Sequence, residues 1–225
     1  MKTLRLKIAT LSIAIATAGL LSSSCNSFTK TQKGAAIGAG AGGVIGAFVG
    51  KAAGNTALGA IIGGAVGGTA GAVIGHKMDK QAAEIQQSVP GATVVRQGEG
   101  ILVKFDSGIL FDVDQAGLKT AAQTNLKNLA TSLNSNPETN ITIIGHTDST
   151  GTYQHNMDLS VRRAEAVKSY IANSGVNASR MSTLGKGPTE PIASNATPDG
   201  RTQNRRVEIT IVANDQMKAQ AKQGQ

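Results

Sequence analysis

The hydrophobic positions in the second half of the chain change their period from one segment to the next, which is typical of alternating strands and helices. Four short apolar runs predict β-strands, at residues 101–105, 141–144, 181–184 and 207–211. The last run is the clearest, because Val207, Ile209 and Ile211 alternate with polar residues. Such alternation indicates a strand with one buried face.

Two longer segments between these runs predict helices. The first follows Asp114, a candidate N-cap, and its apolar face comprises Leu118, Ala122, Leu126, Leu129 and Leu133. The second begins near Ser160, another candidate cap, and its inner face comprises Ala164, Val167 and Ile171. The order β-α-β-α-β-β over residues 92–214 predicts an α+β domain with two helices packed on one mixed sheet. Residues 215–225 are predicted to form a flexible tail.

A polar segment at residues 76–91 precedes this domain. Its few apolar residues, Met78, Ala82, Ile85 and Val89, stand at helical spacing, and Pro90-Gly91 ends the pattern. We interpret the segment as a short connecting helix or linker.

Glycine dominates residues 34–75, which contain 15 glycines and a single charged residue, Lys51. The glycines recur every four residues from Gly34 to Gly54 and again, after a shift of one residue, from Gly59 to Gly75. Small residues at this spacing line one helix face and let another backbone approach closely. The segment resembles a glycine-zipper helical hairpin that turns around residues 51–57. A flexible linker is the alternative, and insertion into a membrane and pairing with other copies of the chain are both compatible with this pattern.

The N-terminal residues 1–24 predict a signal peptide, because a basic start precedes an apolar stretch from Ile8 to Leu21. The only cysteine of the chain ends the sequence Leu-Ser-Ser-Ser-Cys at Cys25. This sequence resembles the lipobox of bacterial lipoproteins, in which the cysteine thiol receives a lipid. Residues 25–33 are then expected to be a lipidated tether at a membrane. With one cysteine, no internal disulfide can form.

The formal net charge of +8 belongs to the N-terminal third of the chain. Residues 1–78 contain seven Lys or Arg and no acidic residue, whereas residues 79–225 contain 15 Lys or Arg and 14 acidic residues, a net charge of +1. The predicted domain therefore lacks the basic surplus with which proteins neutralise nucleic-acid phosphates. A nucleic-acid partner is not expected.

Spaced motifs in the predicted domain resemble those of a known family. They are Gly145-His146-Thr147-Asp148, Asn156, Leu159-Ser160, Arg163-Ala164, Gly185-x-Gly187, Pro191-Ile192-Ala193-x-Asn195 and Gly200-Arg201-x-x-Asn204-Arg205-Arg206-Val207. Together they are similar to the OmpA-like peptidoglycan-binding domain of peptidoglycan-associated lipoproteins. The resemblance covers about residues 92–213 and implies the fold of that family.

The resemblance also implies a site in which Asp148 and Arg163 hold the diaminopimelate side chain of the peptidoglycan stem peptide. That side chain carries an ammonium and a carboxylate on one carbon. A carboxylate accepts from the ammonium, and a guanidinium donates two parallel hydrogen bonds to the carboxylate. If Ser160 caps its helix, Arg163 lies in the first turn, where the helix dipole disfavours a cation. A cation held there would indicate an anionic partner.

Further positions match the family around the same pocket, namely Thr147, Asn156, Leu159, Phe105 and Asp106. Roles in turns and helix caps are equally compatible with these five residues. We interpret another polar set as residues that hold the loop of residues 187–203 on the sheet: Arg201, Asn204, Arg205 and Arg206.

No nucleophile–base pair, catalytic carboxylate pair or metal-ligand spacing emerges, so we expect no enzyme activity, no cofactor and no metal. The expected function is that of an outer-membrane lipoprotein of a Gram-negative bacterium, which tethers the envelope to the cell wall from the periplasmic face. One alternative is a membrane-active protein whose glycine hairpin oligomerises into a pore. Another is the wall anchor of an ion-driven machine, a class that usually carries a long Leu-rich span.

Overall fold

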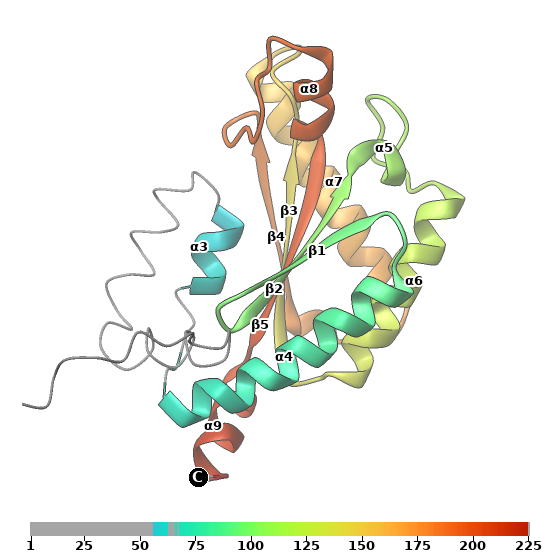
Figure 1. Cartoon of the computed structure of the whole chain (residues 1–225). Helices are drawn as coiled ribbons and strands as arrows, with labels where there is room; N and C mark the ends of the chain where they lie inside the picture. The colour runs from blue at the N-terminus through green and yellow to red at the C-terminus, as the bar shows by residue number, and fades with distance from the viewer. Residues whose placement is uncertain (1–55, 63–65, 67, 225) are drawn as a thin grey trace, which may run out of the picture.

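A mixed five-stranded sheet organises the part of the chain that the computed structural model describes, residues 56–62, 66 and 68–224 (Figure 1). Its strands are β1 Ala92–Gln97, β2 Gly100–Asp106, β3 Thr139–His146, β4 Met181–Gly187 and β5 Arg206–Ala213. They lie in the order β1-β2-β5-β3-β4, and only the β3–β4 pair is parallel. The expected α+β class with a mixed sheet is confirmed.

Helices cover both faces of this sheet. They are α3 Thr56–Ile62, α4 Gly68–Ser88, α5 Ser107–Leu110, α6 Thr120–Ser135, α7 Tyr153–Asn173, the 3₁₀ turn η1 Ala178–Arg180, α8 Pro198–Asn204 and α9 Asp215–Gln223. The predicted order corresponds to β2, α6, β3, α7, β4 and β5. The edge strand β1 was not predicted, because it pairs with β2 alone and its side chains are only half buried.

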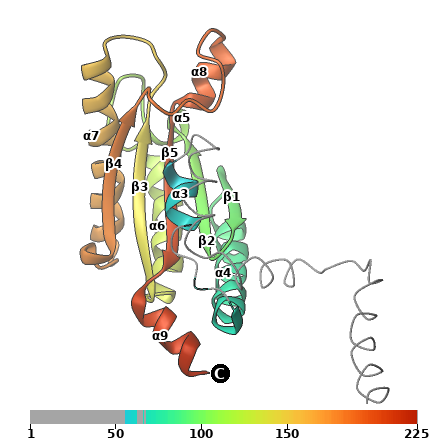
Figure 2. The same cartoon turned by 90° about the vertical axis from the view of Figure 1, so that its left-hand side faces the viewer.

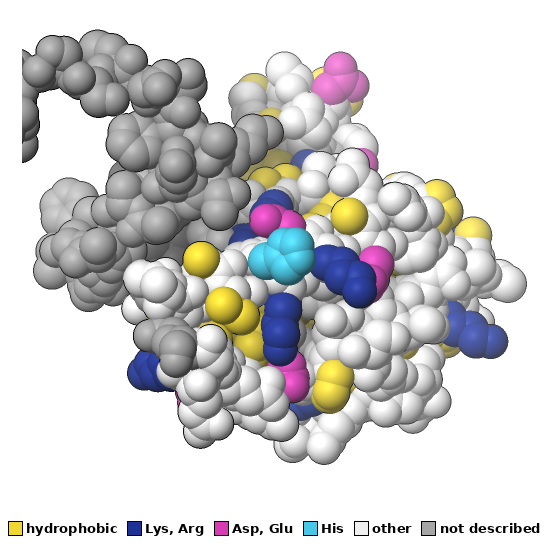
Figure 3. All heavy atoms as spheres, turned by 60° about the horizontal axis from the view of Figure 1, so that its bottom comes forward, with side chains coloured by type: hydrophobic (Ala, Val, Ile, Leu, Met, Phe, Trp, Pro, Cys, Tyr) yellow, Lys and Arg dark blue, Asp and Glu magenta, His cyan; other side chains and the backbone are white. Residues whose placement is uncertain are grey.

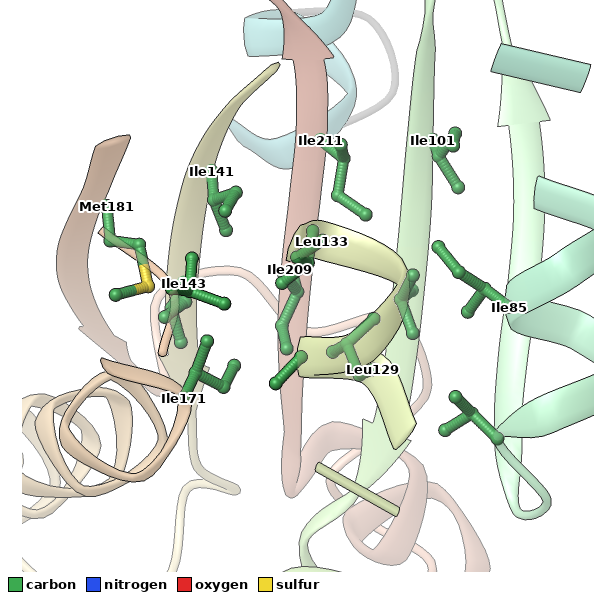
Figure 4. Close-up of a cluster of buried hydrophobic side chains, with 14 of the residues drawn as sticks. Ile85, Ile101, Leu129, Leu133, Ile141, Ile143, Ile171, Met181, Ile209 and Ile211 are labelled. Atoms are coloured by element: carbon green, nitrogen blue, oxygen red, sulfur yellow. The ribbon is translucent and has the colours of Figure 1, made fainter. Parts of the chain in front are cut away.

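The main core lies between one face of the sheet and the helices α4, α6 and α7. Alternate residues of the central strands enter it, including Ile101, Val103, Ile143, Ile209 and Ile211, which are completely buried. In Figure 4, side chains from the three helices gather over these strands: Ile85 from α4, Leu129 and Leu133 from α6, and Ile171 from α7. Each such side chain contributes about 1.5–3 kcal/mol on complete burial.

Residues 76–88 are helical, as the interpretation as a connecting helix expected, but α4 belongs to this core and does not merely connect two parts of the chain. The helical spacing was predicted correctly, since Met78 and Ile85 are completely buried and Val89 nearly so. The helix, however, begins at Gly68 and packs against β1 and α6. A linker would leave this apolar stripe in water, whereas the sheet offers it an apolar partner surface.

The described end of the glycine-rich region departs from a simple hairpin. The second predicted helix, Gly59 to Gly75, is divided between α3 and α4, and the predicted turn at residues 51–57 overlaps the start of α3. In α4, Gly71 and Gly75 face Glu99 and Arg96 of the β1–β2 hairpin instead of another helix. Arg96 Nη2 donates to the Gly75 carbonyl at 3.1 Å. The first glycine series, residues 34–54, lies outside the described residues.

Helix α3 lies on the opposite face of the sheet from α4, α6 and α7, in front of the strands in Figure 2. Its Ala57 and Ile61 are buried against Leu102, Ile144 and Val212. Gly100 of β2 makes room for this contact, because a Cβ there would lie 2.7 Å from the Ile61 side chain. Thr56 donates through its backbone N–H and its hydroxyl to the carboxylate of Glu190.

The C-terminal residues are helical, which corrects the predicted flexible tail. Asn214 caps α9 by accepting from the Met217 N–H at 3.0 Å. Met217 and Ala221 are buried on α4 and complete the main core. The tail prediction failed because these two apolar residues are isolated in a polar sequence and their partner surface is on a distant helix.

The lower end of the molecule, with α4 and α9, has a mixed surface. Figure 3 shows basic and acidic side chains beside one another on this face. Two of the ion pairs are Arg96–Asp79 at 2.9 Å and Lys77–Glu138 at 3.2 Å. In the described part of the chain, no helix has the length together with the apolar character needed to cross a membrane.

Glycines in β3 and β4 let α7 lie directly on these strands. A Cβ at Gly145 would overlap the Ser160 carbonyl and lie 2.9 Å from its carbon, and a Cβ at Gly185 would lie 2.6 Å from Ser160 Oγ. Ser160 Oγ also accepts from the Gly187 N–H at 3.0 Å. This close approach sets the position of α7 relative to the end of β3.

We therefore expect Gly145→Ala to destabilise the protein by about 1–3 kcal/mol, since the added methyl group meets backbone atoms that cannot rotate away. Urea unfolding of the full chain measures this loss. Gly108→Ala is the matched control, because a Cβ there meets nothing within 4 Å. Equal midpoints for the two variants would contradict the expected close approach.

Candidate functional site

A cleft of about 570 Å³ lies at the end of the sheet where β3 ends and β5 begins, near α5, α8 and the start of α7 (Figure 1). Its residues come from segments far apart in the sequence: Ser107, Gly108, Phe111, Asp112, Val113, Asp114, Thr147, Asp148, Thr150, Gly151, His155, Asn156, Leu159, Arg163, Arg201, Thr202 and Arg205. The structure thus brings together five of the seven predicted pocket residues, Asp148, Arg163, Thr147, Asn156 and Leu159.

Asp148 presents an ionised carboxylate to the cleft. It follows the end of β3, and its side chain is only 10 % exposed. Its Oδ1 accepts from the Thr150 N–H at 2.8 Å, and its Oδ2 accepts from Arg205 Nη1 at 2.6 Å. Burial by itself raises the pKa of Asp148, but these two donors outweigh it and hold the pKa below its ordinary value.

Arg163 places a buried guanidinium in the same cleft. Its Nε donates to the Gln115 carbonyl at 2.9 Å and its Nη2 to the Asp112 carbonyl at 3.5 Å, while its centre lies 5.1 Å from the ring centroid of Phe111. Within residues 56–62, 66 and 68–224, it forms no ion pair with a carboxylate. Burial lowers its pKa, although a guanidinium stays charged at any physiological pH.

The helix that carries Arg163 begins earlier than predicted. Thr152, not Ser160, is the N-cap of α7, and its hydroxyl accepts from the His155 N–H at 3.3 Å. Arg163 therefore lies in the middle of α7, and the argument from the helix dipole does not apply to it. Its need for an anion rests instead on its burial without a carboxylate partner.

The other predicted residues that line the cleft shape it. Thr147 and Asn156 are buried, and both use their side chains to fix the loop after β3: Thr147 Oγ1 donates to the Asp148 carbonyl at 2.9 Å and Asn156 Nδ2 donates to the Thr150 carbonyl at 2.8 Å. Leu159 supplies an apolar wall. The alternative turn roles of Thr147 and Asn156 are thus compatible with a place in the cleft.

Phe105 and Asp106 do not line the cleft, so their prediction as pocket residues is wrong. Phe105 is completely buried in the main core, and Asp106 is exposed at the end of β2. The Phe-Asp dipeptide occurs twice in the sequence, and the second copy, Phe111-Asp112, lies at the cleft. Phe111 reaches it because an isolated bridge to Leu118 closes the loop between α5 and α6.

Asp114 belongs to this closed loop and is not a helix cap, which corrects a second prediction. Its backbone has a positive φ of 57°, and its carboxylate lies 2.6 Å from His155 Nε2. The helix α6 instead begins at Thr120 after Lys119. Lys119 pairs with Asp112 at 3.2 Å, so this ion pair and the contact between Asp114 and His155 hold the loop beside the cleft.

The loop between β4 and α8 is fixed largely as predicted. Asn204 is completely buried; its Oδ1 accepts from the backbone N–H groups of Ile192 and Ala193, and its Nδ2 donates to the Ala193 carbonyl. Arg201 donates to the Asn195 carbonyl at 3.0 Å. Arg205, however, points to Asp148, so its assignment to the loop alone missed a cleft residue. No signal in the sequence separates it from its neighbour Arg206.

Behind the cleft, a charged cluster is buried between the sheet and the loop. Arg206 is completely buried; its Nε donates to Glu208 Oε1 at 2.7 Å and its Nη2 to the Glu190 carbonyl at 3.1 Å. His146 Nε2 lies 3.6 Å from Glu208 Oε2. Burial lowers the pKa of His146 and so favours its neutral form. Burial raises the pKa of Glu208, but His146 and Arg206 outweigh it and lower this pKa to about 2.

Neither this cluster nor the cleft offers a metal centre. Across the described ranges, no group of three or more His, Cys, Asp or Glu side chains is arranged to hold an ion. The charged groups of the cleft instead form two opposite binding elements, the carboxylate of Asp148 and the guanidinium of Arg163. A ligand that carries a cation and an anion close together would match both.

Two family models match parts of the chain. Residues 110–205 match the model of the OmpA family, and residues 1–79 match that of the YMGG-like Gly-zipper. These residues of the domain are thus similar to the OmpA family. Of the residues that line the cleft, only Ser107 and Gly108 precede this match. The helices α4 and α9 lie outside it.

Individual relatives support this assignment. Probable lipoprotein YiaD of Escherichia coli is 43% identical over 140 residues, which cover 61% of this chain and 64% of that protein. Peptidoglycan-binding protein ArfA of Mycobacterium tuberculosis is 44% identical over 103 residues, which cover 46% of this chain and 32% of that protein. The match thus spans less than two thirds of either relative's length.

The solved structures include the cell wall anchor of the T6SS from Pseudomonas aeruginosa. It is 28% identical with a TM-score of 0.54, and the match covers 61% of this chain and 97% of that one. The match therefore covers nearly all of that structure and about three fifths of this chain.

The buried cluster predicts a pH dependence of stability. Because the pKa of Glu208 is about 2 in the folded protein and 4.5 ordinarily, its contribution is complete above about pH 4.5 and is lost as the pH falls toward 2. Neutral His146 acts in the same direction below its ordinary pKa of 6.5, since the unfolded chain takes up its proton first.

We expect Glu208→Gln to flatten this dependence between pH 4.5 and 2 and to cost about 3–5 kcal/mol at neutral pH, because it leaves Arg206 buried without its carboxylate. Urea unfolding of the wild type and the variant over this pH range measures both effects. Parallel curves for the two proteins would show that other carboxylates cause the loss of stability in acid.

Proposed function

We propose that the OmpA-like domain of this chain binds peptidoglycan non-covalently, by holding the diaminopimelate side chain of the stem peptide in the cleft. Asp148 accepts hydrogen bonds from the ligand's ammonium, and Arg163 donates to its carboxylate. The observation that carries the proposal is Arg163, a buried guanidinium without a carboxylate partner among the described residues, in the same cleft as an ionised carboxylate. Ligand charges bound here are shielded from water, which strengthens each contact.

The surroundings of Arg163 prepare it for this role. Two loop carbonyls and the Phe111 ring fix the guanidinium, so little side-chain freedom is lost on binding. The names of two relatives agree with the proposal, since one is called a peptidoglycan-binding protein and the other a cell wall anchor. The proposed function is therefore binding, with no catalytic step.

We further propose that the chain tethers the outer membrane to the wall from the periplasmic face. A lipid on Cys25, which lies outside the described residues, would hold one end, and the cleft would hold the other. Support comes from the lipobox-like sequence and from the relative named as a probable lipoprotein. The pore alternative is not favoured, because α3 and α4 already commit Thr56–Ile62 and Gly68–Gly75 to the wall-binding domain.

We expect Asp148→Asn and Arg163→Lys each to weaken binding to purified sacculi by on the order of 2–5 kcal/mol, because each leaves a desolvated ligand charge without its partner. Co-sedimentation of the full chain in detergent measures the affinity, and melting curves report folding. These substitutions are more suitable than alanine, because truncating Arg163 would also leave the carbonyls of the 112–118 loop without a donor.

Matched controls come from the same helix. Asp158→Asn and Arg162→Lys make the same chemical changes at exposed positions outside the cleft, and both should bind as the wild type does. A folded Asp148→Asn variant with wild-type affinity would refute the site assignment. Failure of the wild type to sediment with sacculi would refute the proposed function itself.

For the tether, we expect Cys25→Ala to abolish incorporation of radiolabelled palmitate and to release the protein from the membrane fraction. The thiol is the attachment point in the lipobox-like sequence, and the chain has no second cysteine. Sacculus binding should persist in this variant, because the cleft is unchanged. Undiminished labelling of Cys25→Ala would contradict lipidation at this residue.

A further inference from the structure

The carboxylate that should receive the ligand's ammonium has a cationic partner within the protein itself. Arg205 Nη1 donates to Asp148 Oδ2 at 2.6 Å. We infer that Arg205 is an exchangeable partner, which leaves Asp148 when the ligand's ammonium arrives and donates instead to the ligand's carboxylate. This inference rests on the proposed function and adds the basis of its selectivity.

The exposure of the two side chains shows which partner can move. The side chain of Arg205 is 39% exposed, whereas that of Asp148 is 10% exposed and is also held by the Thr150 N–H. The backbone of Arg205 is fixed, because its N–H donates to the Arg201 carbonyl at 3.0 Å and its carbonyl accepts from the Ser107 N–H at 2.8 Å. Only the side chain can swing, and its movement breaks the partly buried ion pair with Asp148 and the bond that Nη2 donates to Thr202 Oγ1 at 2.8 Å.

Arg163 is different, since its guanidinium is buried and is held by two carbonyls and an aromatic ring. Three arginines line the cleft: Arg163 is fixed, Arg201 donates to the Asn195 and Ala196 carbonyls of the loop, and Arg205 is the one that pairs with Asp148. Two other carboxylates border the cleft, but both are exposed and engaged: Asp112 pairs with Lys119, and Asp114 pairs with His155. Of these three carboxylates, Asp148 is the one that is buried and paired with an arginine of the cleft.

Because of this charge balance, binding of the ligand's ammonium and binding of its carboxylate depend on each other. A ligand with an ammonium alone must displace Arg205 from Asp148, which leaves two guanidiniums in the cleft without a carboxylate. A ligand that also has a carboxylate on the same carbon gives both guanidiniums a new partner. The cleft should consequently prefer a side chain with both charges, as in diaminopimelate, over one with the ammonium only, as in lysine.

The test compares two stem peptides, L-Ala-D-Glu-diaminopimelate and L-Ala-D-Glu-L-Lys, which differ in the carboxylate at the end of the side chain. Calorimetry gives their dissociation constants for the full chain in detergent. In Arg205→Gln, we expect the diaminopimelate peptide to bind at least about tenfold more weakly, because a charge-assisted hydrogen bond is lost. The lysine peptide should bind up to about fivefold more tightly, because Asp148 is no longer occupied.

These opposite changes distinguish an exchangeable partner from a residue that merely positions Asp148. If Arg205 only positioned Asp148, its substitution would weaken the binding of both peptides alike. Arg162→Gln, which removes an exposed cation from the same region, is the matched control and should change both constants by less than about twofold. Equal losses for the two peptides in a folded Arg205→Gln variant would overturn the inference and leave the proposed function intact.

A second variant covers the case in which Arg205→Gln unfolds. Arg205→Lys keeps a cation for Asp148 but cannot donate two parallel hydrogen bonds to a carboxylate. This variant should bind the diaminopimelate peptide more weakly and the lysine peptide with unchanged affinity. Equal losses of affinity for the two peptides would again overturn the inference. If the wild type binds neither peptide, the proposed function fails, and this inference fails with it.

Discussion

The close approach of α7 to β3 and β4 is the contact on which the rest of the site depends. Gly145 and Gly185 have no side chain where the backbone and hydroxyl of Ser160 lie, so the helix rests directly on the strands. Asp148 follows the end of β3, and Arg163 lies one turn beyond Ser160 on α7. A side chain at either glycine would push the helix outward and separate the two charges, even though neither glycine lines the cleft.

The consecutive residues Arg205 and Arg206 form ion pairs of two different kinds. Arg206 and Glu208 are completely buried, and their pair is permanent, because separating them would leave a charge in a medium without water. Arg205, the preceding residue, points to the partly open cleft, where its pair with Asp148 can exchange for another. Adjacent arginines thus have a structural role and a binding role, and burial alone separates the two.

The sequence predicted those parts of the fold that depend on local patterns. The strands 141–144 and 207–211 and the apolar faces of α6 and α7 lie where the periodicity placed them, because each pattern extends over a whole element. The roles of α4 and α9 were missed, since a sparse apolar stripe does not reveal whether a distant surface will cover it. Polar residues that can cap a helix were misassigned for a similar reason, as the predicted caps Asp114 and Ser160 show.

The residues of the candidate site likewise include some that the sequence identified and some that it missed. Asp148 and Arg163 were identified because their motifs are spaced along the chain, and the structure places both in one cleft. Phe111 and Arg205 were missed, because each has a neighbour of the same kind, Phe105 and Arg206, that points into the protein. Which member of such a pair faces the cleft depends on strand register and loop closure, and neither is encoded by composition or periodicity.

The position of α3 has a mechanical consequence for the proposed tether. Tension that is transmitted along the chain enters the described domain at Thr56, whose bonds to Glu190 hold the start of α3 near the cleft end of the sheet. The short helix α3 can detach from the sheet one contact at a time, and residues 56–67, once detached, extend to about 40 Å. The load then reaches α4 beside Gly100, at the opposite end of β2 from the cleft, and runs along the strands. The hydrogen bonds between the strands are perpendicular to that direction and must break together. A small force therefore detaches and extends residues 56–67, and a much larger force is needed to unfold the sheet.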